Sequence, residues 1–429
     1  MRDFDMIVIG GGPAGYHAAA SGVGQGMNVL LLEKDRLGGT CLNRGCIPTK
    51  SFCACAEAAD TVADAASYGI NLPGLEAMRP DMGAIVSRKD EIVKGLREGV
   101  ASLVAGATVV KADAMFITPK VILVHQPAPA GIDGDPLNGG GVEDVITISR
   151  TRLLERFRDE GVDGAMPHDG HDGHDGTYFL ATAPRIVVAT GSRAATLPIP
   201  GADLAVSSTE LLDIKALPLS LAVIGGGVIG MEFASIFASL GAEVTVIEYC
   251  REILPPFDKD VAKRLRTTLQ RRGVKFHLGA EVTSIEPDGS GVMKTVRFRA
   301  KGKELTVTAE TVLMAVGRRP LLPDGMEHCG YAVTPRGALA VDPRFETNIE
   351  GVYAVGDCNG LCMLAHAAEA QAGKVMGEDT DLSVIPSAVF TVPECAMAGL
   401  TEEQAKDQGI DFSAVSYTHL RAHETRHDL

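Results

Sequence analysis

Tryptophan is absent from this 429-residue sequence, and aromatic residues make up only 5% of it. Apolar residues nevertheless make up 45%, so we expect a core of aliphatic side chains, as in α/β proteins. Basic residues are too few to balance the acidic ones, 40 against 55, and the net charge of −15 argues against a nucleic-acid partner. No apolar run is long enough to cross a bilayer, so no membrane partner is expected.

A leader-like segment is also missing before the first apolar run, so a cytoplasmic location is expected. Most of the nine cysteines should be reduced in such a compartment. Seven of them are expected to behave as small, buried or half-buried apolar residues, namely Cys53, Cys55, Cys250, Cys329, Cys358, Cys362 and Cys395. The other two, Cys41 and Cys46, have no Cys/His pair at zinc spacing nearby, which favours redox chemistry over a metal site.

A nucleotide-binding fingerprint begins directly after the unbroken apolar run at residues 6–9. Gly10, Gly12 and Gly15 are followed by a helix of small residues and a second apolar strand that ends at Glu33. Such glycines permit a tight turn, backbone approach to a pyrophosphate and close packing of helix on strand, while the acid can bind a ribose diol. The order strand, glycines, helix, strand and acid therefore predicts a dinucleotide site.

The same pattern recurs after the apolar run at 221–224, with Gly225, Gly227, Gly230 and Glu248. The acid follows the third glycine by 18 positions in both copies. This agreement indicates a second dinucleotide site in the same chain.

The chemistry of the two sites follows from Glu248 and the cysteine pair. A carboxylate at Glu248 favours the 2′-hydroxyl of NAD and opposes the 2′-phosphate of NADP, although Arg251 lies close in sequence. Electrons moving between a nicotinamide and a disulfide need a carrier that stores two of them, which a flavin does. We therefore expect FAD at the first site and NAD at the second.

The cysteine pair lies in the stretch 38–50. In a regular helix, residues five apart have Cα atoms roughly 8–9 Å from each other, whereas a disulfide needs about 4.4–6.8 Å. If Cys41 and Cys46 bond, the segment must be distorted, and Gly45 allows that at little steric cost. Lys50 lies four residues after Cys46, so a helix would place its charge where it favours a thiolate.

With these motifs in place, the chain resembles the flavin-dependent disulfide reductases, and within them the dihydrolipoamide dehydrogenases, from about Asp5 to about Phe412. The motifs that carry the resemblance are residues 38–50, 189–191, 315–320, 347–357, 364–367 and 385–394. The resemblance implies that FAD contacts Gly10, Gly12, Gly15, Glu33, Gly39, Thr40, Lys50, Thr190, Gly191, Asp357, Ala365 and His366. It implies that NAD contacts Gly225, Gly227, Gly230, Glu248 and Gly317.

The resemblance also assigns catalytic roles to four residues. Cys41 would be the interchange thiol that meets the substrate, and Cys46 would be the thiol nearest the flavin. Lys50 would lie by the flavin and pair with Glu232 from the second nucleotide-binding helix, because a buried charge needs a partner.

The fold implied by the resemblance is α/β, with two Rossmann-like domains of the glutathione-reductase type and an incomplete α+β dimerisation domain. The expected boundaries are an FAD domain at 1–191, an NAD domain at 192–316, a central segment at 317–383 returning to the FAD domain, and the start of the dimerisation domain at 384–412.

Two regions depart from the family pattern. Residues 125–177 form an enlarged loop region with a His-Asp-Gly repeat at 168–176, which is expected to be solvated rather than metal-binding. Residues 413–429 contain no His-Pro step, the family's general base, and are expected to be a non-native tail. Without that base, we expect the chain as written to have little dithiol-oxidising activity.

The implied reaction is oxidation of protein-bound dihydrolipoamide to lipoamide, with reduction of NAD through a Cys41–Cys46 disulfide. The expected partners are a second copy of the chain and the lipoyl domains of 2-oxo acid dehydrogenase or glycine cleavage complexes. One alternative is a mercuric or glutathione-type reductase of the same fold. Another is a catalytically silent flavin- or NAD-binding protein, which the missing base favours.

Overall fold

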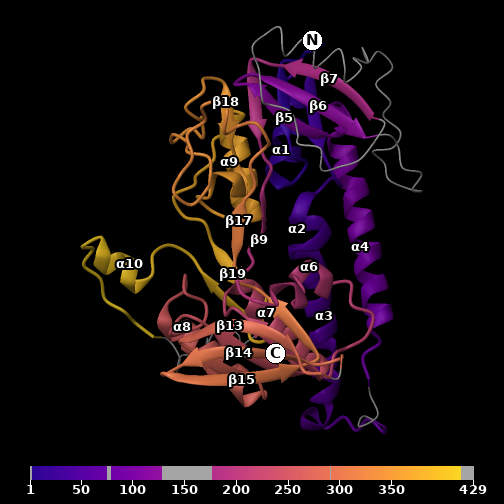
Figure 1. The fold of residues 1–429 in the computed structure, drawn as a ribbon, viewed down its shortest axis with the longest axis vertical. Coiled ribbons are helices and arrows are strands. Elements are labelled where there is room, and N and C mark those ends of the chain that lie inside the picture. The colour runs from indigo at the N-terminus through magenta and orange to yellow at the C-terminus, as the bar shows by residue number, and fades with distance from the viewer. Residues whose placement is uncertain (1, 75–78, 128–175, 290, 417–429) are drawn as a thin grey trace, which may run out of the picture.

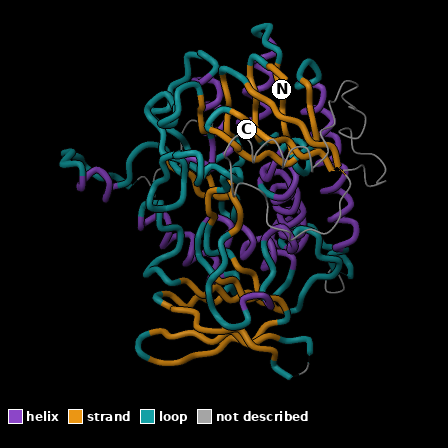
Figure 2. The backbone as a smooth tube through the Cα atoms, turned by 45° about the horizontal axis from the view of Figure 1, so that its top comes forward, coloured by secondary structure: helices purple, strands orange, loops and turns teal. Residues whose placement is uncertain are grey.

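The computed structural model describes residues 2–74, 79–127, 176–289 and 291–416. These residues form two parallel sheets with flanking helices, together with one mixed sheet and several antiparallel ones (Figure 1). Figure 2 shows strands gathered toward both ends of the molecule, with helices between them. The predicted α/β class with two Rossmann-like units is therefore confirmed. No described helix combines the length and the apolarity that a membrane crossing requires.

The first unit is built on a five-stranded parallel sheet in the order β18-β8-β2-β3-β4. Its strands are β18 (Val352–Ala354), β8 (Arg185–Val188), β2 (Met6–Ile9), β3 (Val29–Glu33) and β4 (Thr108–Lys111). Every residue of β2 and β3 is buried, which explains their unbroken apolar sequences. The helices α1 (Pro13–Gly24), α4 (Met82–Leu103) and α9 (Ala365–Val375) flank this sheet.

A four-stranded sheet, β1-β7-β6-β5, belongs to the same unit. Its strands are β1 (Arg2–Asp3), β5 (Asp113–Thr118), β6 (Val121–Pro127) and β7 (Gly176–Thr182). Because β6 runs to Pro127 and β7 begins at Gly176, the expected loop region 125–177 is strand at both ends. The rest of that region, including the His-Asp-Gly repeat, lies outside the described residues.

The second unit is also built on a parallel sheet, which has four strands in the order β12-β11-β10-β16. Its strands are β10 (Ser220–Ile224), β11 (Glu243–Glu248), β12 (Lys275–Leu278) and β16 (Thr311–Met314). The unit also contains the helices α6 (Ser208–Leu211), α7 (Val228–Leu240) and α8 (Lys259–Arg271), with a short η4 turn (Ala202–Leu204). An antiparallel sheet covers it, formed by β13 (Ala280–Pro287), β14 (Lys294–Ala300) and β15 (Lys303–Ala309).

Two strands connect the units. β9 (Ser192–Ala194) leaves the first unit and β17 (Arg318–Pro320) returns to it, and they pair antiparallel. After β17 the chain adds β18 to the first sheet, followed by the η5 turn (Gly356–Asn359). The segment between β17 and α9 therefore belongs to the first unit, because it contributes β18 to that unit's sheet.

Helix α3 (Cys46–Ala63) links the two units in a different way, because it starts beside the first sheet and packs on α7 of the second (Figure 1). It follows the short α2 (Gly39–Arg44) and is continued by η1 (Ala65–Tyr68). Phe52 of α3 and Phe233 of α7 are fully buried in one shared core. Burying a phenylalanine contributes about 1.5–3 kcal/mol, so this contact is a substantial hydrophobic link.

The C-terminal segment lies against the second unit. It contains the hairpin β19 (Ser387–Val389) and β20 (Cys395–Met397), followed by α10 (Glu402–Asp407). The Glu402 amide donates to Asp258 at 2.9 Å, and Glu403 forms an ion pair with Lys259 of α8. Residues 413–416 are described as coil, while the rest of the expected tail lies outside the described residues.

One half-buried polar network ties α3, α7, α8 and the C-terminal segment together. Arg272, directly after α8, donates to Asp60 of α3 at 2.5 Å and to Ser239 of α7 at 2.7 Å. A further N–H of Arg272 donates to the Val392 carbonyl at 3.0 Å. Ser239 also donates to Asp60 at 2.9 Å. A single guanidinium can satisfy these partners because its donors form a fixed, planar fork.

We expect Arg272→Ala to loosen the joint between the units, because it removes one of the two donors to Asp60 and leaves the Val392 carbonyl without its donor. The free energy of unfolding should fall by about 2 kcal/mol, as for loss of hydrogen bonds to a charged group. A urea titration followed by circular dichroism measures this. Arg271→Ala is the matched control, because Arg271 is the exposed neighbour. Equal effects of the two changes would contradict the role given to Arg272.

Candidate functional site

The two glycine-rich turns have almost the same geometry. Gly10 and Gly225 follow β2 and β10 with φ angles of 104° and 108°. A Cβ added to Gly15 would lie 1.7 Å from the Gly10 oxygen, and one added to Gly230 would lie 2.0 Å from the Gly225 oxygen. Only glycine allows these approaches, which bring the start of each helix directly over the strand end.

Both helices present backbone donors at this point. The N-cap residues of α1 and α7 are Gly12 and Gly227, and neither helix start has a side-chain cap. A Cβ on Gly227 would meet no atom within 4 Å, so the turn faces open space. Uncapped N–H groups and the helix dipole bind anions such as a pyrophosphate. These residues therefore fit a dinucleotide at each turn.

The acids that end β3 and β11 are held in the same way. Glu33 Oε2 accepts the Gly11 N–H at 2.6 Å, and Oε1 accepts the amide two residues further on at 2.8 Å. Glu248 accepts from Gly226 and, at 2.5 Å, from the amide two residues further on. Burial raises the pKa of Glu33 above its ordinary value. These contacts orient each carboxylate beside the turn where a ribose would lie.

The cysteine pair lies where one helix ends and the next begins. Cys41 is in α2, which ends at Arg44, and Cys46 is the first residue of α3. A Cβ on Gly45 would lie 3.0 Å from the Thr40 carbonyl oxygen, so the break between the helices is closely packed. The predicted distortion is thus a complete interruption of the helix at Gly45. Both thiols are free in the structure.

The environments of the two thiols differ. The pKa of Cys46 is lowered to about 7, first by the hydrogen bond from the Cys41 thiol and then by Lys50 and the backbone amide at the helix start. Burial and the charge of Glu232 oppose this shift. The pKa of Cys41 is raised above its ordinary value, because its proton serves that hydrogen bond and because it is partly buried. Of the two thiols, Cys46 is therefore the one that ionises first as the pH rises through about 7.

The expected Lys50–Glu232 pair is seen as an interaction between charges rather than a direct contact. Among the described residues no ion pair joins the two, but the charge of Lys50 lowers the pKa of Glu232, and Phe390 contacts both side chains. Lys50 Nζ is 4.3 Å from the centre of the Phe390 ring, and Glu232 Oε1 accepts the Phe390 N–H at 3.0 Å. Burial raises the pKa of Glu232 to about 7, although the Phe390 N–H and the charge of Lys50 lower it. The backbone of the C-terminal segment thus takes part of the role expected of Lys50.

Asp357 lies at the crossing between the units. It accepts from the Ser192 hydroxyl, and Arg318 Nε is 3.9 Å from its Oδ2 atom. Arg318 also donates to the hydroxyl and the carbonyl of Ser192, each at 2.7 Å. Burial lowers the pKa of Arg318, and the charges of Asp357 and Cys46 oppose that shift. Arg318 lies within the motif at 315–320, yet the sequence analysis gave it no role.

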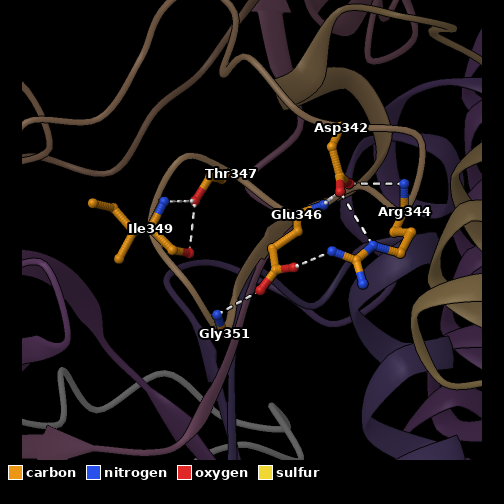
Figure 3. A network of polar contacts seen from close by, with 6 residues as sticks. All are labelled: Asp342, Arg344, Glu346, Thr347, Ile349 and Gly351. Atoms are coloured by element: carbon orange, nitrogen blue, oxygen red, sulfur yellow. Dashed lines mark hydrogen bonds and ion pairs between the residues drawn. The ribbon is translucent and has the colours of Figure 1, made fainter.

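A polar network orders the segment that leads into β18 and Asp357 (Figure 3). Asp342 accepts the amides of Arg344 and Glu346 at 2.8 and 3.0 Å. Glu346 then accepts from the Arg344 guanidinium at 3.1 Å and from the Gly351 amide at 2.7 Å. These contacts fix the turn before β18 and so the position of the residues that follow it.

The remaining expected FAD residues lie around the same edge of the first sheet. Gly39 begins α2, and a Cβ on it would be 2.6 Å from Gly12 Cα, so α2 packs on the start of α1. Thr190 donates to the Leu321 carbonyl, whose amide donates to the Gly191 carbonyl at 2.9 Å.

The other expected cofactor residues lie at the second crossing and at the start of α9. The Gly317 carbonyl accepts the Ala195 amide at 2.9 Å. Ala365 is the first residue of α9, and His366 Nε2 is 2.9 Å from the Pro386 carbonyl. That histidine contact joins α9 to the C-terminal segment.

Sequence reasoning missed a tyrosine–carboxylate pair near the thiols. The Tyr16 hydroxyl of α1 donates to Glu369 of α9. Partial burial and Glu369 raise the pKa of Tyr16, and the charge of Cys41 adds to this effect. No local sequence signal predicts the pair, because 353 positions separate its members.

We expect Cys46 of the reduced protein to react with iodoacetamide at a rate that rises with pH through about 7. Cys41 should react only at more alkaline pH. Lys50→Met removes a favourable charge, so the pKa of Cys46 should rise. At pH 7 its alkylation should slow by about fivefold, if the pKa rises by roughly one unit. Mass spectrometry of the alkylated peptides measures both rates.

The control for this experiment is Lys94→Met, which removes an exposed lysine from α4. It should leave the pH profile of Cys46 unchanged. A Lys50→Met profile that matches the parent protein would show that the Lys50 charge does not tune this thiol.

The geometry can now be compared with known proteins. The family model of the pyridine nucleotide-disulphide oxidoreductases matches residues 4–372. The model of that family's dimerisation domain matches residues 385–428, which supports a homodimer. This second match extends beyond Phe412, where the sequence analysis placed the end of the family resemblance.

Curated relatives align over most of the chain. A dihydrolipoyl dehydrogenase of Chlamydia muridarum is 33% identical over 96% of this chain and 79% of its own length. The dihydrolipoyl dehydrogenase of Bacillus subtilis is 33% identical over 94% of this chain and 78% of its own length. A leghemoglobin reductase of Glycine max is 32% identical, over 97% of this chain and 72% of its own length.

A solved structure agrees with these results. The HOCl-induced flavoprotein disulfide reductase of Escherichia coli, solved as a Cu(II) complex, has a TM-score of 0.71 and 27% identity. The alignment covers 95% of this chain and 80% of that one. Together with the matched family models, the paired nucleotide turns and the cysteine pair, this shows that the chain belongs to the pyridine nucleotide-disulphide oxidoreductase family.

Proposed function

We propose that this chain oxidises protein-bound dihydrolipoamide to lipoamide and reduces NAD, with FAD as its resident cofactor. The observation that carries the proposal is the helix break at Gly45, which places Cys41 and Cys46 side by side at the start of α3. The nucleotide turns at α1 and α7 supply the two cofactor sites that such a reaction requires. The dihydrolipoyl dehydrogenases among the relatives support the choice of substrate.

The thiol chemistry can be assigned to the two cysteines. In the oxidised state, a substrate thiolate attacks Cys41 Sγ, the Cys41–Cys46 bond breaks, and Cys46 leaves as a thiolate. The second substrate thiol then attacks the mixed disulfide, which releases Cys41 and closes the substrate disulfide. The low pKa of Cys46 makes it the better leaving group, and the raised pKa of Cys41 suits the thiol that takes up a proton.

The proposed cofactor sites follow from the two glycine-rich turns and the acidic residue beside each of them. The residues that would hold FAD lie at the first turn, with Gly12 at the pyrophosphate, Glu33 at the adenosine ribose and Asp357 at the ribityl chain. When bound, FAD supplies a two-electron carrier between the cysteine pair and NAD. The second turn, with Gly227 and Glu248, would hold NAD.

The proposal extends to partners and location. A lipoyl domain would present its dithiol to Cys41, and the second copy of the chain would complete a homodimer. The proposed location is the cytoplasm, where the cysteines outside the redox pair would stay reduced.

The test compares the holoprotein with its Cys41→Ser and Cys46→Ser variants. Anaerobic reductive titration should deliver two electron pairs to the parent protein and one pair to either variant, because each variant loses the disulfide. Dihydrolipoamide-dependent NADH formation should fall at least about a thousandfold in both variants, as expected when a catalytic nucleophile is removed.

Flavin reduction by NADH provides the control, because it does not use the thiols and should persist in both variants. Retained dihydrolipoamide turnover in either variant would refute the disulfide mechanism. A parent protein that takes up two electron pairs yet oxidises no dihydrolipoamide would limit the failure to the thiol step, that is, to the proposed substrate or to the general base that activates it.

A further inference from the structure

The hydrogen bond between Tyr16 and Glu369 lies near the thiols, and the proposed thiol steps do not use it. The Tyr16 hydroxyl, near the start of α1, donates to Glu369 of α9. The two helices pack against each other, and Gln25, directly after α1, donates to the carbonyl of Met376, directly after α9, at 2.8 Å. Because contacts join the helices at more than one point, the Tyr16–Glu369 pair is held in a fixed place.

Cys41 lies close to this pair because α2 packs on the start of α1. A Cβ added to Gly39, the first residue of α2, would lie 2.6 Å from Gly12 Cα and 3.7 Å from Pro13 Cδ. Cys41 follows Gly39 on α2, and Tyr16 follows Pro13 on α1, each within one helical turn. The thiol that would meet the substrate and the tyrosine therefore lie at the same junction of helices.

Two charges of opposite sign act on Cys41 from different helices. The pKa of Cys41 is raised first by its hydrogen bond to Cys46 and then by burial, and the charge of Glu369 adds to this rise. The charge of Lys50 opposes it. Lys50 Nζ lies 4.3 Å from the centre of the Phe390 ring, against the C-terminal segment. A molecule that meets Cys41 therefore encounters one cation and one anion.

The charge of Glu369 is not neutralised by a cation. None of the residues that the structure describes forms an ion pair with Glu369. Tyr16 instead provides a hydrogen bond that carries no positive charge. Burial and then Glu369 raise the pKa of Tyr16, so this hydroxyl keeps its proton at neutral pH and remains a donor. The contact therefore orients the carboxylate and leaves its negative charge close to the thiol.

We propose that Glu369, oriented by Tyr16, is a specificity determinant at Cys41 that disfavours thiols carrying a carboxylate and so favours uncharged dithiols. An amide-linked dihydrolipoyl group carries no charge, whereas free dihydrolipoate ends in a carboxylate. Like charges several ångströms apart repel each other in a half-buried site, because less water screens them there. The inference rests on the proposed function, because it narrows the substrate class of the same thiol pair.

The first test measures the charge at Cys41 with two reagents of nearly equal size. Iodoacetamide is neutral and iodoacetate is anionic, and both alkylate a thiolate. The reduced holoprotein carries Cys46→Ser, so that Cys41 is the one thiol of the pair, and mass spectrometry follows its peptide. The ratio of the two rates is normalised to the ratio for 2-mercaptoethanol. It does not depend on the pKa of Cys41, because the thiolate fraction cancels.

Three variants separate the charge from the hydrogen bond. Glu369→Gln removes the charge and keeps an oxygen that accepts from Tyr16. It should lower the normalised ratio of iodoacetamide to iodoacetate rates about fivefold, as for two unit charges several ångströms apart. Tyr16→Phe removes the hydrogen bond and keeps the charge, so the ratio should change less than about twofold. Lys50→Met should raise the ratio, because it removes the cation that attracts iodoacetate.

The matched control is Glu378→Gln, because Glu378 is another carboxylate that joins the end of α9 to α1. It accepts from the Ser21 hydroxyl at 2.8 Å and lies 3.0 Å from His17 Nε2. The charges that shift the pKa of Cys41 do not include that of Glu378. Its loss should therefore leave the alkylation ratio unchanged.

The second test measures turnover of the holoenzyme with Cys46 intact, with dihydrolipoamide or dihydrolipoate as donor and NAD as acceptor. The parent enzyme should have the higher kcat/KM with dihydrolipoamide. Glu369→Gln should narrow this preference about threefold, a smaller effect because the substrate carboxylate lies farther from the reacting sulfur. Added salt should also narrow the preference of the parent, because salt screens exposed charges.

The inference would be overturned by an alkylation ratio that Glu369→Gln leaves unchanged, or by an equal fall of that ratio in the Glu378→Gln control. A changed alkylation ratio with an unchanged preference between the two dithiols would also overturn it, because the charge would then not act on the substrate. If the parent oxidises neither dithiol, the proposed function fails, and the alkylation ratio still decides whether Glu369 sets the charge at Cys41.

Discussion

The packing of α3 against α7 is the contact on which the rest of the site depends. Helix α3 begins at Cys46 beside the first nucleotide turn, and α7 begins at the second turn and carries Glu232. Their shared core and the Arg272 network fix the distance between the two cofactor sites. Electron transfer between the sites requires such fixed geometry, because small displacements of reacting groups are costly in rate.

The two Rossmann units are nearly identical at their turns and differ in what surrounds them. Beside the first turn lies the helix break with its thiol pair, whereas the second unit carries an added antiparallel sheet, β13-β14-β15. The shared features bind what two dinucleotides have in common, a pyrophosphate and a ribose. The chemistry specific to this protein therefore depends on the features that differ between the two units, as is general for functions built on a common fold.

The sequence predicted the features that depend on short-range geometry. The glycine turns, the acids at Glu33 and Glu248 and the interrupted helix at Gly45 all follow from spacing and from the steric freedom of glycine. The expected pairing of Lys50 with Glu232 stays a prediction, and no sequence signal indicated Phe390, which contacts both from a segment 158 positions after Glu232. Spacing carries no information about such a contact.

By itself, the sequence determined the fold class, the two glycine turns with their acids and the helix break between the two cysteines, because each is encoded by residues within a short stretch of the chain. Only the tertiary structure decided which contacts lower the pKa of Cys46 and how Glu232 is satisfied. Those properties depend on charges, dipoles and burial contributed by distant segments. Electrostatic interactions act through space over several ångströms, so neighbours in the fold set them rather than neighbours in the chain.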